Sequence, residues 1–131
     1  SRSDLVRLLH YRSLGIDPAT SRYRANEART AKRLEESLGL RLRRGGKTEG
    51  DWVDLRNGKS YDSVGGDGPR GQFSIDAFAR SLEKHLRDYD FPVVDLNEFN
   101  SPDNAAQVED YLKTLPDDQR RRTIVIPIHG N

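Results

Sequence analysis

The chain has 131 residues, of which 34% are hydrophobic and 33% are charged, and these proportions suit a folded domain rather than a disordered segment. It has no cysteine, which excludes disulfide frameworks, thiolate zinc sites and cysteine nucleophiles. No apolar run is long enough to span a bilayer, so we expect no membrane span in this fragment. Methionine is absent even at position 1, which predicts a domain cut from a longer protein.

The net charge of +1 hides an uneven distribution. Residues 1–50 contain 12 Lys or Arg against 6 Asp or Glu, whereas residues 51–131 contain 10 against 15. Arginine provides 17 of the 22 basic residues, and its planar guanidinium binds phosphate in a bidentate manner. Such a bias is also common on solvated helices, but it makes the basic half a candidate surface for a polyanion. The nucleic-acid contacts expected there are Arg41, Arg43 and Arg44.

The first half of the chain predicts two helices followed by three strands. Ser3 as an N-cap and Gly15 beyond the last turn bound a first helix, which we expect to be accessory, within residues 1–20. A longer helix is predicted over residues 21–38, with Gly39 as its stop signal. Alternating hydrophobicity then predicts three strands, near residues 40–44, 51–55 and 60–64, the last two joined by a tight "NG" turn.

The second half predicts two further helix–strand pairs after a glycine-rich segment, residues 65–71, which we expect to be mobile. Apolar residues at helical spacing predict one helix, with the stripe Ile75, Phe78, Leu82 and Leu86. "FPVVDL" predicts a short buried strand, "SPDNAAQVEDYLKTLP" a capped helix and "TIVIPI" a final strand. The order α-α-β-β-β-α-β-α-β predicts a single mixed α/β domain of the α+β type over residues 1–131.

Glu27 is an acid on the apolar side of the second helix. At about 100° per residue it falls within the same arc as Tyr23, Ala31, Leu34 and Leu38. A buried carboxylate is costly unless a cation or hydrogen-bond donors compensate it, so the position predicts either a bound cation or a salt bridge to an arginine. Glu35 and Glu36 lie at or beyond the margin of the stripe, and we expect them to be solvated.

Two registers are open for the hairpin around "NG". A two-residue type I′ turn puts Asp54 opposite Tyr61 and sends Asp54 and Asp62 to opposite faces. A type I turn with Gly58 as a bulge puts Asp54 opposite Ser60, and the two acids then share a face. The hydrophobic pattern does not decide between them, and a functional argument favours the bulge.

That functional argument is a metal site. Asp54 and Asp62 from neighbouring strands, with Glu27 from a packed helix, would give an oxygen cage for Mg²⁺, with Mn²⁺ or Zn²⁺ as further possibilities. A divalent ion in such a cage lowers the pKa of a bound water and shields phosphate charge.

Four segments resemble the C-terminal toxin domains of contact-dependent growth inhibition proteins: "ANEARTAKRLEESLGLRL", "GDWVDLRNGKSYDSVGG", "FSIDAFARSLEKHL" and "FPVVDLNEF". The similarity covers residues 21–131, and the middle segment is its most specific part. It implies a restriction-endonuclease-like core of the PD-(D/E)XK type, whose order of elements agrees with the order above. Residues 21–131 would form the catalytic core.

The resemblance also implies roles for individual residues. The family's helix glutamate, second-strand aspartate and third-strand acid map onto Glu27, Asp54 and Asp62 as metal ligands and catalytic groups. Its lysine two residues after the third-strand acid is replaced by Val64. Lys84 on the following helix is then the candidate for steadying the pentacovalent phosphate, with Lys59 or His85 as substitutes.

The function implied by the resemblance is a metal-dependent endonuclease that cleaves tRNA in a competing bacterium. Its expected partner is a cognate immunity protein, and its expected origin is a secreted or cell-surface bacterial protein that acts in the target cytoplasm. Two alternatives stay open from the sequence: a metal-dependent DNase on the same fold, and a non-catalytic module that binds nucleic acid or protein.

Overall fold

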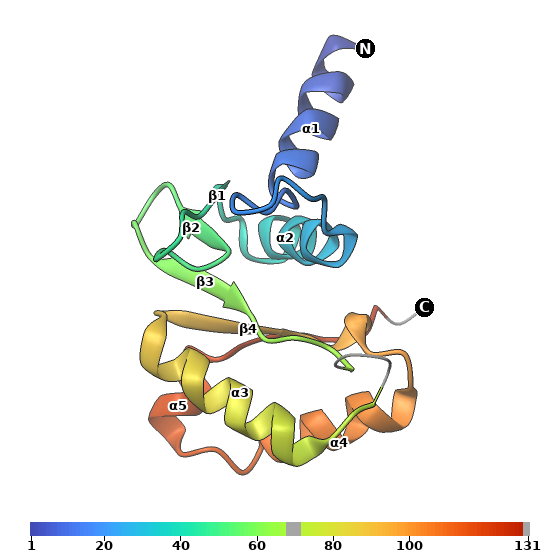
Figure 1. The fold of residues 1–131 in the computed structure, drawn as a ribbon, viewed down its shortest axis with the longest axis vertical. Helices are drawn as coiled ribbons and strands as arrows, with labels where there is room; N and C mark the ends of the chain where they lie inside the picture. Colours follow the sequence, from blue (N-terminus) through green and yellow to red (C-terminus); the bar gives the residue numbers. More distant parts are fainter. Residues whose placement is uncertain (68–71, 130–131) are drawn as a thin grey trace. The chain divides into compact units, whose positions relative to one another are not determined.

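Two compact units make up the chain, Ser1–Tyr61 and Asp62–Asn131, in a computed structural model that describes residues 1–67 and 72–129. Figure 1 traces their helices and strands along the chain. Residues 68–71 of the glycine-rich segment, expected to be mobile, lie outside the described residues. The assignment of residues 1–131 to a single domain stays a prediction, with residues 1–20 as its accessory part.

The first unit contains two helices and the antiparallel strands that follow them. Its elements are α1 (Arg2–Ser13), α2 (Ala25–Leu38), β1 (Leu42–Arg44), β2 (Trp52–Asp54) and the first half of β3 (Ser60–Ser63). β1 pairs with β2, and β2 pairs with β3, both antiparallel. The two predicted helices and three predicted strands are therefore confirmed, with differences at their ends.

Both helices of the first unit begin at residues other than the predicted ones. The N-cap of α1 is Ser1, not Ser3, because the Ser1 hydroxyl accepts the Asp4 N–H at 3.3 Å and the Asp4 side chain bonds back. The α2 helix begins at Ala25 rather than near residue 21, because Ser21 has a left-handed φ of 60° that no helix continues through. The stop at Gly39 is as predicted, with φ 65°.

The core of the first unit is built around Trp52, which is fully buried. The indole N–H of Trp52 donates to the Leu14 carbonyl at 2.8 Å, so the strand side chain also fixes the chain after α1. Ala31 and Leu34 of α2 are fully buried in the unit, as the stripe predicts. The predicted stripe is too long, however, because Tyr23 and Leu38 at its ends are half exposed.

The β2–β3 hairpin adopts neither of the two anticipated registers. Trp52 lies opposite Tyr61 and Val53 opposite Ser60, so the loop spans residues 55–58. The Gly58 N–H donates to the Asp54 carbonyl at 2.8 Å, and Gly58 takes the positive φ of 70° that this closure requires.

This register decides which side chains share a face. Residues directly opposite each other point the same way, and successive strand residues alternate, so Trp52, Asp54 and Tyr61 share one face of the hairpin. Asp62 follows Tyr61 along β3 and therefore points to the other face. The bulged register, which would have put Asp54 and Asp62 on one face, is not formed; the reason is a four-residue loop in place of a three-residue one.

The second unit packs helices beside a parallel pair of strands (Figure 1). Its elements are α3 (Ile75–Asp88), β4 (Phe91–Asp95), a short 3₁₀ helix η2 (Leu96–Glu98), α4 (Pro102–Leu112), α5 (Asp117–Arg122) and β5 (Ile124–Ile126). β4 and β5 are parallel, and the Val64 N–H just after β3 donates to the Val93 carbonyl at 2.8 Å. The mixed α+β class and the order α-α-β-β-β-α-β-α-β are confirmed, with η2 and α5 as additions.

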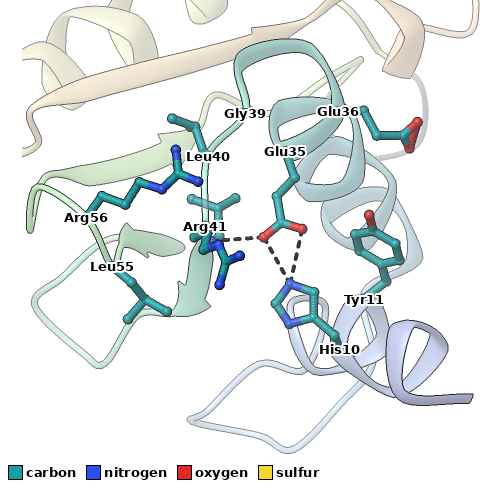
Figure 2. A pocket seen from close by; sticks show the side chains of 10 residues that line it. His10, Tyr11, Glu35, Glu36, Gly39, Leu40, Arg41, Leu55 and Arg56 are labelled. Atoms are coloured by element: carbon teal, nitrogen blue, oxygen red, sulfur yellow. Dashed lines mark hydrogen bonds and ion pairs between the residues drawn. The ribbon is translucent and has the colours of Figure 1, made fainter. Parts of the chain in front are cut away.

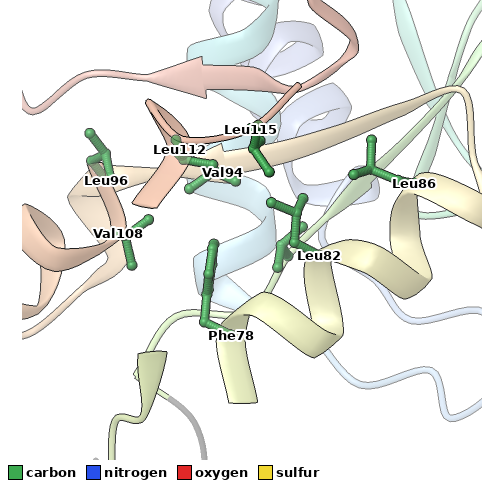
Figure 3. Close-up of a cluster of buried hydrophobic side chains, with 9 residues drawn as sticks. Phe78, Leu82, Leu86, Val94, Leu96, Val108, Leu112 and Leu115 are labelled. Atoms are coloured by element: carbon green, nitrogen blue, oxygen red, sulfur yellow. The ribbon is translucent and has the colours of Figure 1, made fainter. Parts of the chain in front are cut away.

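The core of the second unit is the predicted helical stripe and its partners. Figure 3 shows Phe78, Leu82 and Leu86 from α3 pointing toward Val94 of β4 and the side chains of α4. Leu82 and Val94 are fully buried. These contacts join α3, β4 and α4. They fix the orientation of α3 and therefore the positions of the side chains on its other faces.

Leu82→Ala is expected to lower the free energy of unfolding by about 2–5 kcal/mol, because it removes buried methyl groups and leaves a cavity. Urea denaturation followed by far-UV circular dichroism measures the loss. Arg87→Ala on the same helix is the control, since the Arg87 side chain is 65% exposed and should change stability by no more than about 0.5 kcal/mol. Equal losses for the two variants would contradict the packing.

Candidate nuclease site

Asp54 is the predicted site residue with the most sharply defined surroundings. It ends β2, is only 2% exposed, and its Oδ1 accepts the main-chain N–H of Arg56 at 3.1 Å and, more weakly, that of Arg41 at 3.4 Å. The contact with the N–H two residues on is an Asx turn, which "DLRNG" could have indicated from sequence. Both of these hydrogen bonds are made by Oδ1, and no hydrogen bond of Oδ2 is found among the described residues.

Glu27 is half-buried and forms an ion pair with Arg44, the salt bridge that the sequence left open as an alternative. Arg44 also donates to the Ile16 carbonyl from Nε and to the Leu14 carbonyl from Nη1, both at 3.0 Å. Its guanidinium carbon lies 5.8 Å from the centre of the Trp52 ring. Most N–H donors of Arg44 are therefore hydrogen-bonded within the first unit, although Arg44 was expected to contact nucleic acid.

Asp62 and His85 meet within the second unit. Asp62 Oδ2 lies 2.9 Å from His85 Nε2, and His85 Nδ1 lies 2.6 Å from the Ser81 carbonyl oxygen. A carbonyl oxygen only accepts, so Nδ1 carries a proton, and the contact between Nε2 and the carboxylate requires a second proton shared by the pair. The pair thus holds a transferable proton next to a half-buried acid, a property that suits acid–base chemistry.

The lysine candidates lie on exposed surface. Lys84 of α3 points away from the core stripe, as helical arithmetic from Leu82 predicts, and Lys59 lies directly after the hairpin loop. The role of either in catalysis stays a prediction.

The remaining predicted nucleic-acid contacts, Arg41 and Arg43, differ in how they are engaged. The Arg43 guanidinium binds Glu49 through two hydrogen bonds of 3.0 and 2.7 Å. Chiefly because of these bonds, and also of the Gly46 N–H, the pKa of Glu49 is lowered to about 2. No acid partner of the Arg41 side chain is found in the described part of the chain. Arg41 is thus the freer of the two for a phosphate.

Glu27, Asp54 and Asp62 as the ligands of one metal ion stay a prediction. Within residues 1–67 and 72–129, no group of three His, Asp or Glu side chains could hold a metal ion. Glu27 is occupied by Arg44 and Asp62 by His85, so neither presents a free carboxylate of the kind that a divalent ion prefers. Metal dependence therefore stays a prediction.

Sequence reasoning missed a second His–carboxylate pair, formed by His10 and Glu35. Glu35 was expected to be solvated, yet its side chain is only 12% exposed and lies 2.9 Å from His10 Nε2. Its Oε2 also accepts the Leu42 N–H at 2.9 Å, which joins α2 to the start of β1. The position of Glu35 at the margin of the apolar stripe was the available signal.

Arg43→Ala is expected to raise the pKa of Glu49 from about 2 toward its ordinary value of 4.5, because the largest cause of the lowered pKa is removed. A carboxyl ¹³C NMR titration measures this pKa. The lowered pKa stabilises the fold above about pH 4.5, and the contribution is lost as the pH falls toward 2. Lys47→Ala serves as the control, and a Glu49 pKa unchanged by Arg43→Ala would refute the ion pair.

Arg44→Met is expected to lower the free energy of unfolding by about 2–4 kcal/mol, because it leaves the Glu27 carboxylate and two main-chain carbonyls without their hydrogen-bond donor. Urea denaturation measures the change. Arg43→Ala is the matched control, since an exposed ion pair contributes about 0–1 kcal/mol. If Arg44→Met were no more destabilising than Arg43→Ala, the structural role of Arg44 would be wrong.

No protein-family model matches the chain, and no curated protein matches it significantly. Among solved structures, the chain is similar to the CdiA-CT toxin from Burkholderia pseudomallei, which was solved in complex with its cognate CdiI immunity protein. The two are 26% identical over 79% of this chain and the whole of that chain, with a TM-score of 0.65.

A search of the described helices for a stretch that is both long and apolar enough to traverse a lipid bilayer finds none. The structural likeness covers 79% of the chain, and so it extends over most of the residues on which the sequence resemblance rests. The resemblance inferred from the sequence is therefore confirmed: the chain is similar in structure to a CdiA-type C-terminal toxin domain.

Proposed function

We propose that this chain is an RNA-cleaving toxin domain, with tRNA as its substrate and a cognate immunity protein as its inhibitor. The observation that carries the proposal is the likeness to a CdiA-CT toxin over 79% of the chain, together with the immunity protein bound to that toxin. The resemblance of the sequence to such toxin domains implies nuclease activity, delivery from a secreted or cell-surface protein, and action in the target cytoplasm.

The charge distribution supports a nucleic-acid substrate. The basic excess lies in residues 1–50, and Arg41 lies there with no acid partner in the described residues. Phosphate contacts of this kind position a nucleic acid without reading its sequence. Such contacts fit DNA as well as RNA, so the choice of tRNA rests on the resemblance.

Asp54 is the residue that we propose as the central catalytic acid. Its Oδ1 is held by main-chain amides, which fixes the side chain, and no hydrogen bond of its Oδ2 is found among the described residues. The Asp62–His85 pair supplies a proton that could be given to a leaving oxygen. Glu27 and Lys84 stay in the proposal as supporting residues, and a divalent ion, Mg²⁺ first, as a cofactor to be tested.

Purified protein incubated with a tRNA pool and, in parallel, with plasmid DNA is expected to cleave only the tRNA. Adding EDTA and then restoring Mg²⁺, Mn²⁺ or Zn²⁺ tests the cofactor, with loss and recovery expected. Cleavage of plasmid alone would make the chain a DNase, and binding of either without cleavage would make it an interaction module. Cleavage unaffected by EDTA would refute the metal dependence, and the proposed nuclease activity would still stand.

Asp54→Asn is expected to lower the rate of tRNA cleavage by about 100-fold or more, the usual range for removing a positioned acid or base. The amide oxygen can still accept the Arg56 N–H, so the loop should be preserved, and circular dichroism checks this. Asp76→Asn, at an exposed position in the first turn of α3, is the matched control. Full activity of Asp54→Asn would remove Asp54 from the mechanism.

A further inference from the structure

The first unit contains a hollow of about 480 Å³ that none of the predicted catalytic acids lines. Its walls come from the end of α1, the end of α2, the start of β1 and the β2–β3 loop. Figure 2 shows Arg41 and Arg56 on the strand side and His10, Tyr11 and Glu35 on the helix side. A cavity of this size is in the usual range for small-molecule sites, about 300–1,000 Å³.

Two arginines line the strand side of the hollow, and two glutamates of α2 line its helix side. Among the described residues neither Arg41 nor Arg56 has an acid partner, in contrast to Arg43 with Glu49 and Arg44 with Glu27. Guanidinium groups without a carboxylate at the rim of a hollow are suited to bind phosphate oxygens through charge-assisted hydrogen bonds.

The backbone beneath these arginines is fixed by one acid. Asp54 Oδ1 accepts the main-chain N–H of Arg56, and lies 3.4 Å from that of Arg41. The Leu55 N–H in turn donates to the Arg41 carbonyl at 2.7 Å, which holds the loop against the start of β1. Both arginines therefore project from positions that are set before any ligand binds, and this lowers the entropic cost of binding.

The carboxylate that faces the arginines is already engaged. Both oxygens of Glu35 lie within 3.1 Å of His10 Nε2, and one also accepts the Leu42 N–H. An ionised carboxylate only accepts, so His10 Nε2 carries the proton in this contact. Glu36 points away from Glu35 in Figure 2. Glu35 thus holds the helix wall together and leaves the arginines to another anion.

The same hollow also offers surface for an apolar or aromatic group. Leu55 is 62% exposed at its edge, although large aliphatic side chains are usually buried. Burial and the nearby carboxylates of Glu35 and Glu36 raise the pKa of Tyr11, so its hydroxyl stays a hydrogen-bond donor at neutral pH. A ligand that carries both a phosphate and a flat ring would satisfy both parts.

We propose that this hollow binds a phosphate-bearing nucleotide, with Arg41 and Arg56 on the phosphate and Tyr11 and Leu55 beside the base. The proposed RNA-cleaving function supplies the source, a nucleotide of the bound RNA held outside the bond that is cut. A free nucleotide offers the same chemistry, and the experiment separates the two sources.

The test measures binding of AMP by isothermal titration calorimetry, because AMP has no phosphodiester bond and cannot be a nuclease substrate. We expect AMP to bind more tightly than adenosine, and Arg41→Ala/Arg56→Ala to weaken AMP at least tenfold. Arg80→Ala/Arg87→Ala removes the same charge from exposed positions of α3 and should leave AMP binding unchanged. Arg41→Lys/Arg56→Lys, which keeps the charge, should lose less AMP affinity than the alanine double variant.

A second arm measures tRNA binding by filter retention across salt concentrations. If the nucleotide belongs to RNA, the alanine double variant should lower both the tRNA affinity and the steepness of its salt dependence. Unchanged tRNA binding with lost AMP binding would make the ligand a free nucleotide and overturn the RNA source. If the alanine double variant bound AMP as tightly as the unaltered protein, the proposed nucleotide site would be wrong. The site would also be wrong if this variant lost only the binding of an immunity protein.

The failure of this proposal is distinguishable from failure of the nuclease. A chain that cleaves no RNA but binds AMP through Arg41 and Arg56 keeps the pocket and loses the proposed function. If the chain cleaves RNA and the alanine double variant still binds AMP normally, the proposed function stands and the proposed nucleotide site is wrong.

Discussion

The first unit depends on one guanidinium. Arg44 joins the Glu27 carboxylate of α2 to the carbonyls that follow α1, and its position over Trp52 ties both to the strands. A half-buried charge of this kind is stable only while its partners remain. The consequence for function is direct, because the acid that resembles a catalytic glutamate is also half of a structural ion pair. Loss of activity on replacing Glu27 must therefore be separated from loss of fold.

The hairpin loop imposes the second constraint. Four loop residues closed at Gly58 set the register, and the register gives Asp54 and Asp62 different faces and different partners. Asp54 holds the main chain at Arg56 in the loop and at Arg41 just before β1, while Asp62 pairs with His85.

The hydrophobic pattern of the sequence predicted the features that depend on that pattern alone. The α3 stripe from Phe78 to Leu86 and the order of elements followed from periodicity, because burial of an apolar face dictates both. The start of α2, the hairpin register and the engagement of Glu35 did not follow. The start of α2 and the hairpin register depend on backbone conformations that the hydrophobic pattern does not report, the positive φ of Ser21 and the four-residue loop closed at Gly58. The engagement of Glu35 depends on His10, 25 residues away in sequence, which no short window of residues contains. The choice between a metal and an arginine at Glu27 was open for the same reason.

The central claim is that the chain stops growth by cutting RNA. Inducing it in Escherichia coli and sequencing the ends of cellular tRNA over the first minutes tests this most directly. We expect new tRNA ends at one defined position to accumulate before growth stops, and to be absent when Asp54→Asn is induced. Growth arrest with all tRNA intact would contradict the account.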